Sequence, residues 1–499
     1  MEKVKYVLSL DQGTTSSRAI VFNSNGEIVG VGQNEFKQYY PKPSFVEHDA
    51  LEILQSQLDA VRQALTNSNI EINQIEAVGI TNQRETTVAW DSETGIPIYN
   101  AIVWQCRRTD YICEELVNDG LKDYIKETTG LLVDPYFSGT KMKWIMDNVP
   151  KAKDLSKLGR LRIGTIDTWL IYSLTKGEKF VTDVTNASRT MIFDIHKLCW
   201  DEKIINYLGI PMSALPKVVE SSGICGFTSQ EVLGAKIPIA GVAGDQHAAL
   251  FGQCCFDVGS TKNTYGTGCF TLMNTGDKVI NSQNGLLSTI AWSVGGEVCY
   301  ALEGSAFNAG SAIQWLRDEL KIIKSAQECD MLAETIDSTG GVYFVPAFTG
   351  LGAPYWDMYA RGSFLGLTRG TGKAEIARAV LESIVYESCD LFKAMEHDSG
   401  AKIPALKVDG GASKSEFLMQ YQADMLAIEV QRPICMETTA LGAAMLAGLA
   451  TGVWESKEKL KAIWNLDKSF KPNFEQEKVD NATKYWQKAV NASRNWAQL

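Results

Sequence analysis

Short apolar runs separated by polar turns fill the beginning of the chain, a pattern typical of β-strands. Residues 6–10 and 18–22 are the first two runs, and a turn at 23–26 precedes a third strand expected over 27–36. The polar residues 11–17 connect the first two runs. We therefore predict an antiparallel meander whose first connection is unusually long and rich in hydroxyl groups.

An amphipathic helix is predicted to follow this meander. Asp49 is a residue type that caps helix N-termini, and apolar residues then recur at spacings of three and four, which places them on one helix face. This would be the apolar face of the helix. Its residues are Leu51, Leu54, Leu58, Val61 and Leu65.

The remainder of the chain alternates apolar runs with polar strand ends, which predicts an α/β fold. We place the division near residue 250, giving domains at 1–250 and 251–499 that face each other across a cleft. The Ala- and Gly-rich stretch 439–454 is bounded by glutamates and is predicted to be a buried helix. Further strands are expected at 76–80, 237–243, 269–273, 343–348 and 406–408.

Length and charge narrow the class of protein. A chain of 499 residues is too long for one core, and a net charge of −11 without long basic runs argues against nucleic acid or an anionic membrane as partner. No secretory signal and no membrane span are visible. The eleven cysteines lack metal-binding spacing and the four histidines lie far apart, so we expect reduced thiols, a cytoplasmic location, and no zinc site or histidine-based triad.

Two Gly- and Thr-rich loops are candidate phosphate sites. Small hydroxyl residues beside a glycine present backbone N–H groups to an anion, as residues 13–17 and 265–268 do. Asp11 adds a carboxylate suited to a hydrated divalent cation, and Arg18 adds a fixed positive charge. An empty polar hairpin would explain one such loop equally well, but two facing loops could hold ATP between lobes. The Walker A, protein-kinase and dinucleotide signatures are absent.

Two strand ends are candidate sites for a hydroxyl substrate. Asp245 follows an apolar strand and could accept a hydroxyl proton, or it could cap the next helix. Arg84-Glu85 offers donors and an acceptor side by side, which suits a polyol, although a surface ion pair is the commoner case. Trp104 and Tyr136 are large aromatic residues whose role the sequence leaves open between core packing and a binding wall.

Six motifs in order resemble the FGGY family of carbohydrate kinases over essentially the whole chain. Each one alone could arise by chance, whereas the ordered set is highly specific. The motifs are Asp11–Arg18, Gly79–Thr86, Tyr136–Trp144, Ala243–Gln246, Gly362–Leu367 continuing through Ala379–Glu382, and Asp409–Ala412.

This resemblance implies two actin/hexokinase-like, ribonuclease-H-like lobes flanking a central cleft, and it implies MgATP-dependent phosphorylation of glycerol to sn-glycerol 3-phosphate. The first lobe would carry the glycerol site and the first phosphate loop, and the second lobe the second phosphate loop and the adenosine site. Relatives assemble as homodimers or homotetramers. The implied roles are general base for Asp245; glycerol binding for Arg84, Glu85, Trp104, Tyr136, Asp245, Gln246 and Phe270; ATP binding for Thr14, Thr15, Ser16, Arg18, Thr267, Gly310, Gln314, Gly411 and Ser415; and magnesium binding for Asp11.

Several positions depart from the family pattern. Ser415 stands where an asparagine is usual, and Cys269 where a glycine is common. Residues 232–236 lack the Gly-rich, Arg-ending loop through which some members sense fructose 1,6-bisphosphate, and residues 223–236 lack the phosphorylatable histidine of others. The sequence therefore does not support the assignment of either regulatory mode.

Two alternatives remain open at this point. One is a kinase for another polyol or ketose, such as dihydroxyacetone or xylulose. The other is a non-catalytic, nucleotide-responsive switch on the same two-lobed fold, which would predict a degraded substrate site.

Overall fold

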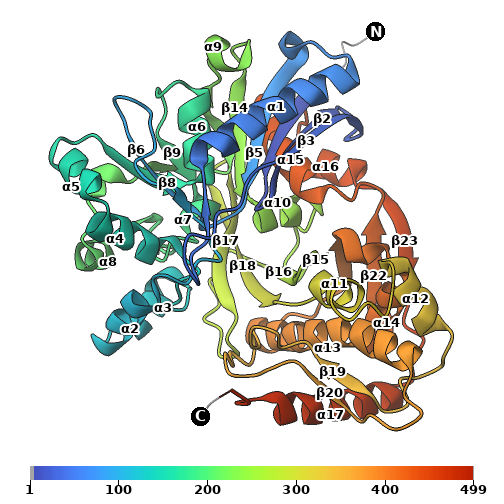
Figure 1. The fold of residues 1–499 in the computed structure, drawn as a ribbon. Helices are drawn as coiled ribbons and strands as arrows, with labels where there is room; N and C mark the ends of the chain where they lie inside the picture. Colours follow the sequence, from blue (N-terminus) through green and yellow to red (C-terminus); the bar gives the residue numbers. More distant parts are fainter. Residues whose placement is uncertain (1–4, 498–499) are drawn as a thin grey trace.

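The computed structural model describes residues 5–497 and contains one long mixed sheet covered by helices on both faces (Figure 1). The sheet has 13 strands in the order β23-β22-β21-β15-β16-β18-β17-β13-β14-β5-β1-β2-β3. Its strands are β1 (Tyr6–Gln12), β2 (Ser16–Asn23), β3 (Ile28–Glu35), β5 (Ile75–Asn82), β13 (Ser222–Phe227), β14 (Pro238–Gly244), β15 (Thr261–Tyr265), β16 (Cys269–Gly276), β17 (Leu287–Val294), β18 (Glu297–Ala306), β21 (Ala405–Asp409), β22 (Glu429–Pro433) and β23 (Leu466–Phe470).

The same strand order occurs twice within this sheet, which confirms the two-lobed prediction. In one half β3, β2 and β1 form an antiparallel meander, and β5 and β14 continue from β1 in parallel. In the other half β18, β16 and β15 are antiparallel, and β21 and β22 continue from β15 in parallel. In both halves the parallel strands direct their carboxyl ends toward the polar loops.

Helices cover both faces of the sheet and fill the space around it. They are α1 (Ala50–Ser68), α2 (Asp110–Asn118), α3 (Lys122–Thr129), α4 (Ser138–Asn148), α5 (Pro150–Lys157), α6 (Ile166–Leu174), α7 (Val184–Ala187), α8 (Glu202–Leu208), α9 (Gln230–Leu233), α10 (Asp245–Gly252), α11 (Gly310–Asp318), α12 (Ala326–Glu334), α13 (Lys373–Ser399), α14 (Glu416–Leu426), α15 (Thr438–Thr451), α16 (Lys457–Ile463) and α17 (Gln476–Ser493), with 3-10 turns at Ile72–Gln74, Met212–Ala214 and Gly411–Lys414.

Smaller sheets complete the fold. One has four strands in the order β4-β7-β6-β8, and three more are strand pairs. Their strands are β4 (Glu47–His48), β6 (Thr87–Asp91), β7 (Ala101–Ile102), β8 (Leu161–Thr165), the pair β9 (Val181–Asp183) and β12 (Lys217–Val219), the pair β10 (Phe193–Asp194) and β11 (Cys199–Trp200), and the pair β19 (Tyr343–Val345) and β20 (Ser363–Leu365).

Successive residues of β1 enter two different cores, which explains its unbroken apolar run. Leu8 and Leu10 pack in a cluster with residues of α1 and α6. Val7 points to the opposite face, where its cluster includes Ala444 and Met445 of α15. The helix α15, drawn in red beside the blue strands, is buried as predicted (Figure 1).

The connection between β1 and β2 is shorter than the sequence suggested. The strands pair as far as Gln12 with Ser17, and the turn closes with a hydrogen bond from Gly13 N to Ser16 O of 2.9 Å. Polar residues continue these strands because their side chains find buried partners: Gln83 Nε2 donates to Gln12 Oε1 at 3.0 Å. The prediction of a long loop over residues 11–17 is therefore wrong.

The helix α1 forms as predicted and Val61 of its predicted apolar face is buried, but most of the other buried residues are small ones outside that face. The Asp49 carboxylate accepts hydrogen bonds from the first-turn amides, whereas Leu51 is 49% exposed. Small residues face the sheet instead, because glycines in β3 allow the helix backbone to come close: a Cβ at Gly32 would lie 2.0 Å from Ala60 O. Leu54, Leu58 and Leu65 pack at the edges of this contact.

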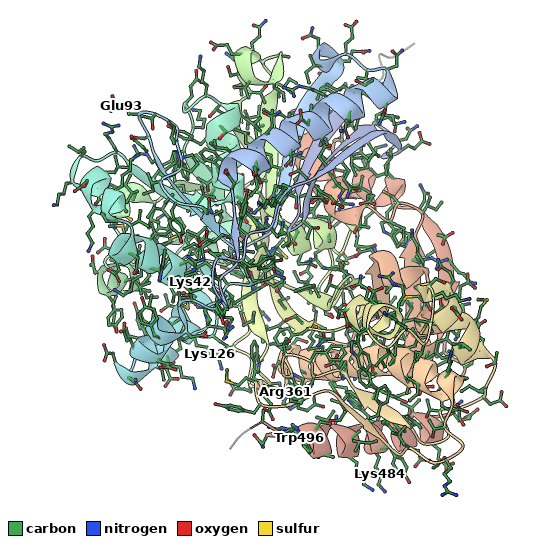
Figure 2. All side chains as sticks on the ribbon, in the orientation of Figure 1. Lys42, Glu93, Lys126, Arg361, Lys484 and Trp496 are labelled. Atoms are coloured by element: carbon green, nitrogen blue, oxygen red, sulfur yellow. The ribbon has the colours of Figure 1, made fainter. Side chains whose placement is uncertain are left out.

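Two further findings concern the sequence predictions. No helix within residues 5–497 has the length and apolarity needed to cross a membrane. All eleven cysteines lie in the described part of the chain as unpaired thiols. Side chains such as Glu93 and Lys484 extend outward at the periphery (Figure 2).

Candidate active site

Asp245 lies at the first position of α10, directly after β14. Gly244 is the capping residue of this helix, so the alternative that Asp245 serves only as a cap is wrong. Its Oδ1 accepts a hydrogen bond from Gln246 N at 2.7 Å and lies 3.1 Å from Arg84 Nε. The side chain is 32% exposed, so a small ligand can reach the carboxylate.

Burial raises the pKa of Asp245, and the neighbouring Arg84 guanidinium opposes this shift only in part. A carboxylate with a raised pKa has a higher affinity for a proton. This is a favourable property for a group that removes a proton from a hydroxyl.

Arg84 and Glu85 are buried, so the surface-pair alternative is wrong: their side chains are 2% and 1% exposed. They occupy the turn after β5, where Glu85 takes a left-handed conformation with φ of 60°. Arg84 donates to both carboxylate oxygens of Glu303, at 2.6 and 2.9 Å. Arg189 Nε donates to Glu85 Oε1 at 2.7 Å. The strand end therefore carries a cluster of alternating charges next to Asp245.

An aromatic pair adjoins this cluster. The rings of Trp104 and Tyr136 meet edge-to-face at 5.6 Å, and Arg189 lies 5.7 Å from the centre of the Tyr136 ring. Trp104 Nε1 donates to Thr14 Oγ1 at 3.0 Å. The pair thus connects the charged cluster to the first phosphate loop, and pure core packing does not describe it.

The buried Lys262 contacts two further residues predicted to bind glycerol, Gln246 and Phe270. Lys262 Nζ donates to Gln246 Oε1 at 2.5 Å, to Thr264 Oγ1 at 2.9 Å and to the carbonyl oxygen of Phe270 at 3.2 Å. Burial lowers the pKa of Lys262 to about 8. The side chain of Phe270, on β16, is half-buried.

The first candidate phosphate loop carries a three-residue ion cluster. Arg18 lies 2.5 Å from Asp11 Oδ2 and 2.6 Å from Glu437 Oε2. Burial raises the pKa of Asp11 although Arg18 opposes it. At the tip of the loop Thr15 is exposed, and Ser16 accepts a hydrogen bond from Gln33. Because Glu437 precedes α15, this cluster joins segments from both halves of the chain.

The second candidate phosphate loop lies against the beginning of α11. The carbonyl oxygen of Thr267 accepts hydrogen bonds from Ala309 N at 2.8 Å and from Ser311 N at 3.1 Å. The side chain of Thr267 is exposed. A Cβ at Gly310 would lie 2.7 Å from Gly266 O, so glycine is required for this approach. On the same helix Gln314 is exposed.

Comparison with known protein families identifies the family of this chain. Residues 6–252 match the N-terminal domain of the FGGY family of carbohydrate kinases, and residues 261–451 match the C-terminal domain of that family. The chain belongs to this family.

Relatives within the FGGY family cover the full length of the chain. Glycerol kinase of Symbiobacterium thermophilum is 58% identical over 492 residues, and glycerol kinase 2 of Thermotoga maritima is 56% identical over 493 residues; each match spans 99% of both chains. The crystal structure of Plasmodium falciparum glycerol kinase with ADP superposes with a TM-score of 0.92 at 37% identity, covering 98% of each chain. Gluconate kinase from Lactobacillus acidophilus, at 24% identity and a TM-score of 0.87, shows the shared fold.

The departures from the FGGY pattern have structural counterparts. Ser415 caps α14 by accepting from Leu418 N, and its hydroxyl donates to Asp330 at 2.7 Å. Cys269 is fully buried at the start of β16 beside Phe270.

Gly411 is one of the predicted nucleotide-binding residues. A Cβ at Gly411 would meet no atom within 4 Å, so the adjoining backbone is open to a ligand.

Three residues of this site were missed by the sequence analysis: Arg189, Lys262 and Glu303. Each is a single charged residue within or beside an ordinary strand or turn, with no motif around it. Their side chains are fully or almost fully buried. Arg189 and Glu303 pair with residues far away in sequence, whereas the partners of Lys262 lie within 16 residues of it. The one available signal was a charged residue within an otherwise apolar strand, as for Glu303 in β18.

Proposed function

We infer that this FGGY kinase transfers the terminal phosphoryl group of ATP to glycerol, forming sn-glycerol 3-phosphate and ADP. The observation that carries this inference is the intact cluster of Asp245, Arg84 and Glu85 at adjacent strand ends. A non-catalytic switch would be free to lose this cluster. The full-length similarity to proteins named glycerol kinase supports the same substrate.

Asp245 acts as general base in this proposal. Its carboxylate takes the proton of a terminal glycerol hydroxyl while that oxygen bonds to the γ-phosphorus. The bond from phosphorus to the bridging oxygen breaks on the opposite side, and ADP leaves with the electron pair. The remaining hydroxyls hydrogen-bond to the charged cluster, and the aromatic residues cover the carbon side. The substrate residues are Arg84, Glu85, Trp104, Tyr136, Asp245, Gln246 and Phe270.

ATP binds across both phosphate loops in this proposal. Hydroxyl and backbone groups of the two loops bind the phosphates, and Arg18 offsets their negative charge. The N-terminal domain at 1–250 supplies the first loop, and the domain at 251–499 supplies the second loop and the adenosine side. The residues assigned are Thr14, Thr15, Ser16, Arg18, Thr267, Gly310, Gln314, Gly411 and Ser415.

Magnesium fits the donor set at the first loop. Within residues 5–497 no cluster of three metal-ligating side chains is present, and Mg²⁺ in phosphoryl transfer needs only one or two carboxylates besides phosphates and water. The buried Asp11 carboxylate is suited to this role. When bound, the ion neutralises charge on the transferring phosphoryl group. Removing magnesium with excess chelator should abolish turnover, and adding it back should restore it; undiminished turnover would remove magnesium from the account.

A coupled ADP assay tests the substrate directly. With ATP and magnesium, ADP production should depend on glycerol and be much slower with dihydroxyacetone, xylulose or no acceptor. A site that hydrogen-bonds several hydroxyls rejects analogues that leave its buried polar groups unpaired, at about 1–3 kcal/mol for each group. Faster turnover with xylulose would mean that the substrate is a ketose and not glycerol. ATP hydrolysis that needs no acceptor would favour the non-catalytic, nucleotide-responsive switch.

The pH dependence follows from the raised pKa of Asp245. Because only the ionised form accepts a proton, kcat/KM for glycerol should fall about tenfold per pH unit below that pKa. The midpoint should lie above 3.8, the ordinary value for aspartate. Circular dichroism measured at each pH distinguishes this fall in kcat/KM from acid unfolding of the protein. A flat profile down to pH values at which the protein still folds would contradict the base role.

We further propose that the protein works in the cytoplasm as a homodimer or homotetramer. The unpaired cysteines support a reducing compartment. Light scattering coupled to size-exclusion chromatography tests the assembly.

A further inference from the structure

We propose that Glu303 is a positioning residue for the phosphorylation of glycerol, which fixes the orientation of Arg84 and keeps that guanidinium from binding the Asp245 carboxylate more tightly. This inference rests on the proposed function. Glu303 lies on β18, in the C-terminal half of the chain, whereas Arg84, Arg189 and Asp245 belong to the N-terminal half. Its side chain is 2% exposed, so it does not present its own surface to solvent.

The hydrogen bonds of Arg84 show what Glu303 contributes. Nη1 and Nη2 each donate once to Glu303, at 2.6 and 2.9 Å, and Nε faces Asp245 at 3.1 Å. A guanidinium has five N–H donors, so two remain for a substrate hydroxyl. Because the bidentate contact fixes the plane of the guanidinium, it also fixes the direction of these two donors.

Arg189 provides an independent observation. Its side chain is fully buried, and only Nε makes a hydrogen bond, to Glu85. Nη2 lies 3.2 Å from Glu303 Oε1, but neither Nη1 nor Nη2 has a hydrogen-bond partner among the described residues. Buried donors without partners are uncommon in folded proteins, so the Glu303 carboxylate beside Nη2 offsets the charge at this end of the guanidinium. Glu85 also lies next to both arginines, but it is Glu303 that accepts hydrogen bonds from Nη1 and Nη2 of Arg84.

The balance of charge predicts how the site responds to loss of Glu303. Burial alone would raise the pKa of Glu303, but Arg189 and Arg84 outweigh it and keep this carboxylate ionised. Removing its charge frees the Arg84 fork for Asp245 and removes a nearby negative charge. Both changes lower the proton affinity of Asp245. The groups whose charges act on the pair are Arg84, Lys262 and Asp11 around Asp245, and Arg84, Arg189, His247 and Glu85 around Glu303.

Steady-state kinetics of E303Q test this role. We expect KM for glycerol to rise about 30-fold or more, with kcat also reduced, while KM for ATP changes less than about threefold. The acid limb of the pH profile should move to lower pH. E303D keeps the charge with a shorter side chain, so it should restore the wild-type pH profile and part of the glycerol affinity.

A matched control separates positioning from general loss of stability. Glu382 is a buried carboxylate paired with Arg378 at 2.7 Å in α13. E382Q should alter neither KM for glycerol nor the pH profile. If E303Q fails to fold, E303D still tests the proposal through its intact pH profile and raised KM. Unchanged KM for glycerol, or equal rises in KM for glycerol and ATP, would overturn the positioning role.

Failure of the proposed function can be distinguished from failure of the Glu303 proposal. The proposed function is wrong if the wild-type protein makes no ADP with glycerol. In that case calorimetric titration of glycerol into wild type and E303Q still measures the role of Glu303. Weaker binding to the variant supports that role, and equal binding contradicts it.

Discussion

Asp245→Asn is expected to reduce glycerol-dependent turnover by about 10³-fold, within the range that a positioned general base contributes. Asparagine has nearly the same shape and can still accept the hydrogen bond from Gln246 N. It cannot take the hydroxyl proton, however. Because Asp245 lies at the acceptor side of the reaction, affinity for ATP should stay near the wild-type value. The measurement is kcat by coupled ADP release, together with calorimetric titration of ATP.

The stability of the same variant serves as its control. Burial raises the pKa of Asp245 above 3.8, so the folded protein binds this proton more tightly than the unfolded chain. Stability contributed by that proton is lost as pH rises through the folded-state pKa, and at pH 7 the ionised carboxylate opposes folding. Asparagine removes this charge, so the free energy of unfolding should equal or exceed the wild-type value. Wild-type turnover in a stably folded Asp245→Asn variant would remove Asp245 from the base role.

Gly442→Ala is expected to have the largest effect on stability. The helices α10 and α15 cross at this glycine, where an added Cβ would lie 1.8 Å from Ala248 O. The opposing Gly252 is equally close, with its Cβ position 2.1 Å from Thr438 O. Backbone atoms on both sides leave no flexible side chain to move away. Overpacking of this kind destabilises proteins by about 1–3 kcal/mol and sometimes more, and we expect the upper end.

This crossing should also affect the proposed catalysis, because α10 begins at Asp245. Pushing the two helices apart displaces that carboxylate, so kcat for glycerol should fall along with the denaturant midpoint. Gly223→Ala in β13 is a matched control, since the nearest atom to its Cβ position is 4.0 Å away; we expect a change within about 0.5 kcal/mol. If denaturant unfolding showed that Gly442→Ala changes the free energy of unfolding as little as Gly223→Ala does, the packing argument would be contradicted.

Much of the architecture could be predicted from local pattern, and the failures have specific physical causes. The meander, the buried helix near residue 440 and the two halves follow from apolar periodicity and turn residues. The buried face of α1 does not, because it depends on Gly30 and Gly32 in a neighbouring strand. The length of the first phosphate loop also escaped prediction, since polar residues such as Gln12 continue a strand when a buried partner accepts them.

The site divides in the same way. Residues inside motifs, such as Arg84, Glu85 and Asp245, could be nominated because the resemblance fixes their positions. Glu303, Arg189 and Lys262 stand alone in the sequence. The importance of Glu303 and Arg189 arises from pairing between distant segments, and that of Lys262 from contacts with Gln246 and Phe270. Ser415 illustrates the reverse case, since the structure engages its hydroxyl in a helix cap and a contact with Asp330.

The most direct test is a crystal structure with glycerol and a non-hydrolysable ATP analogue. We expect a terminal glycerol oxygen within about 2.6–3.2 Å of the Asp245 carboxylate and in line with the terminal phosphorus, with the other hydroxyls bound by Arg84 and Glu85. A glycerol molecule bound elsewhere, with Asp245 turned away from every ligand oxygen, would contradict the account.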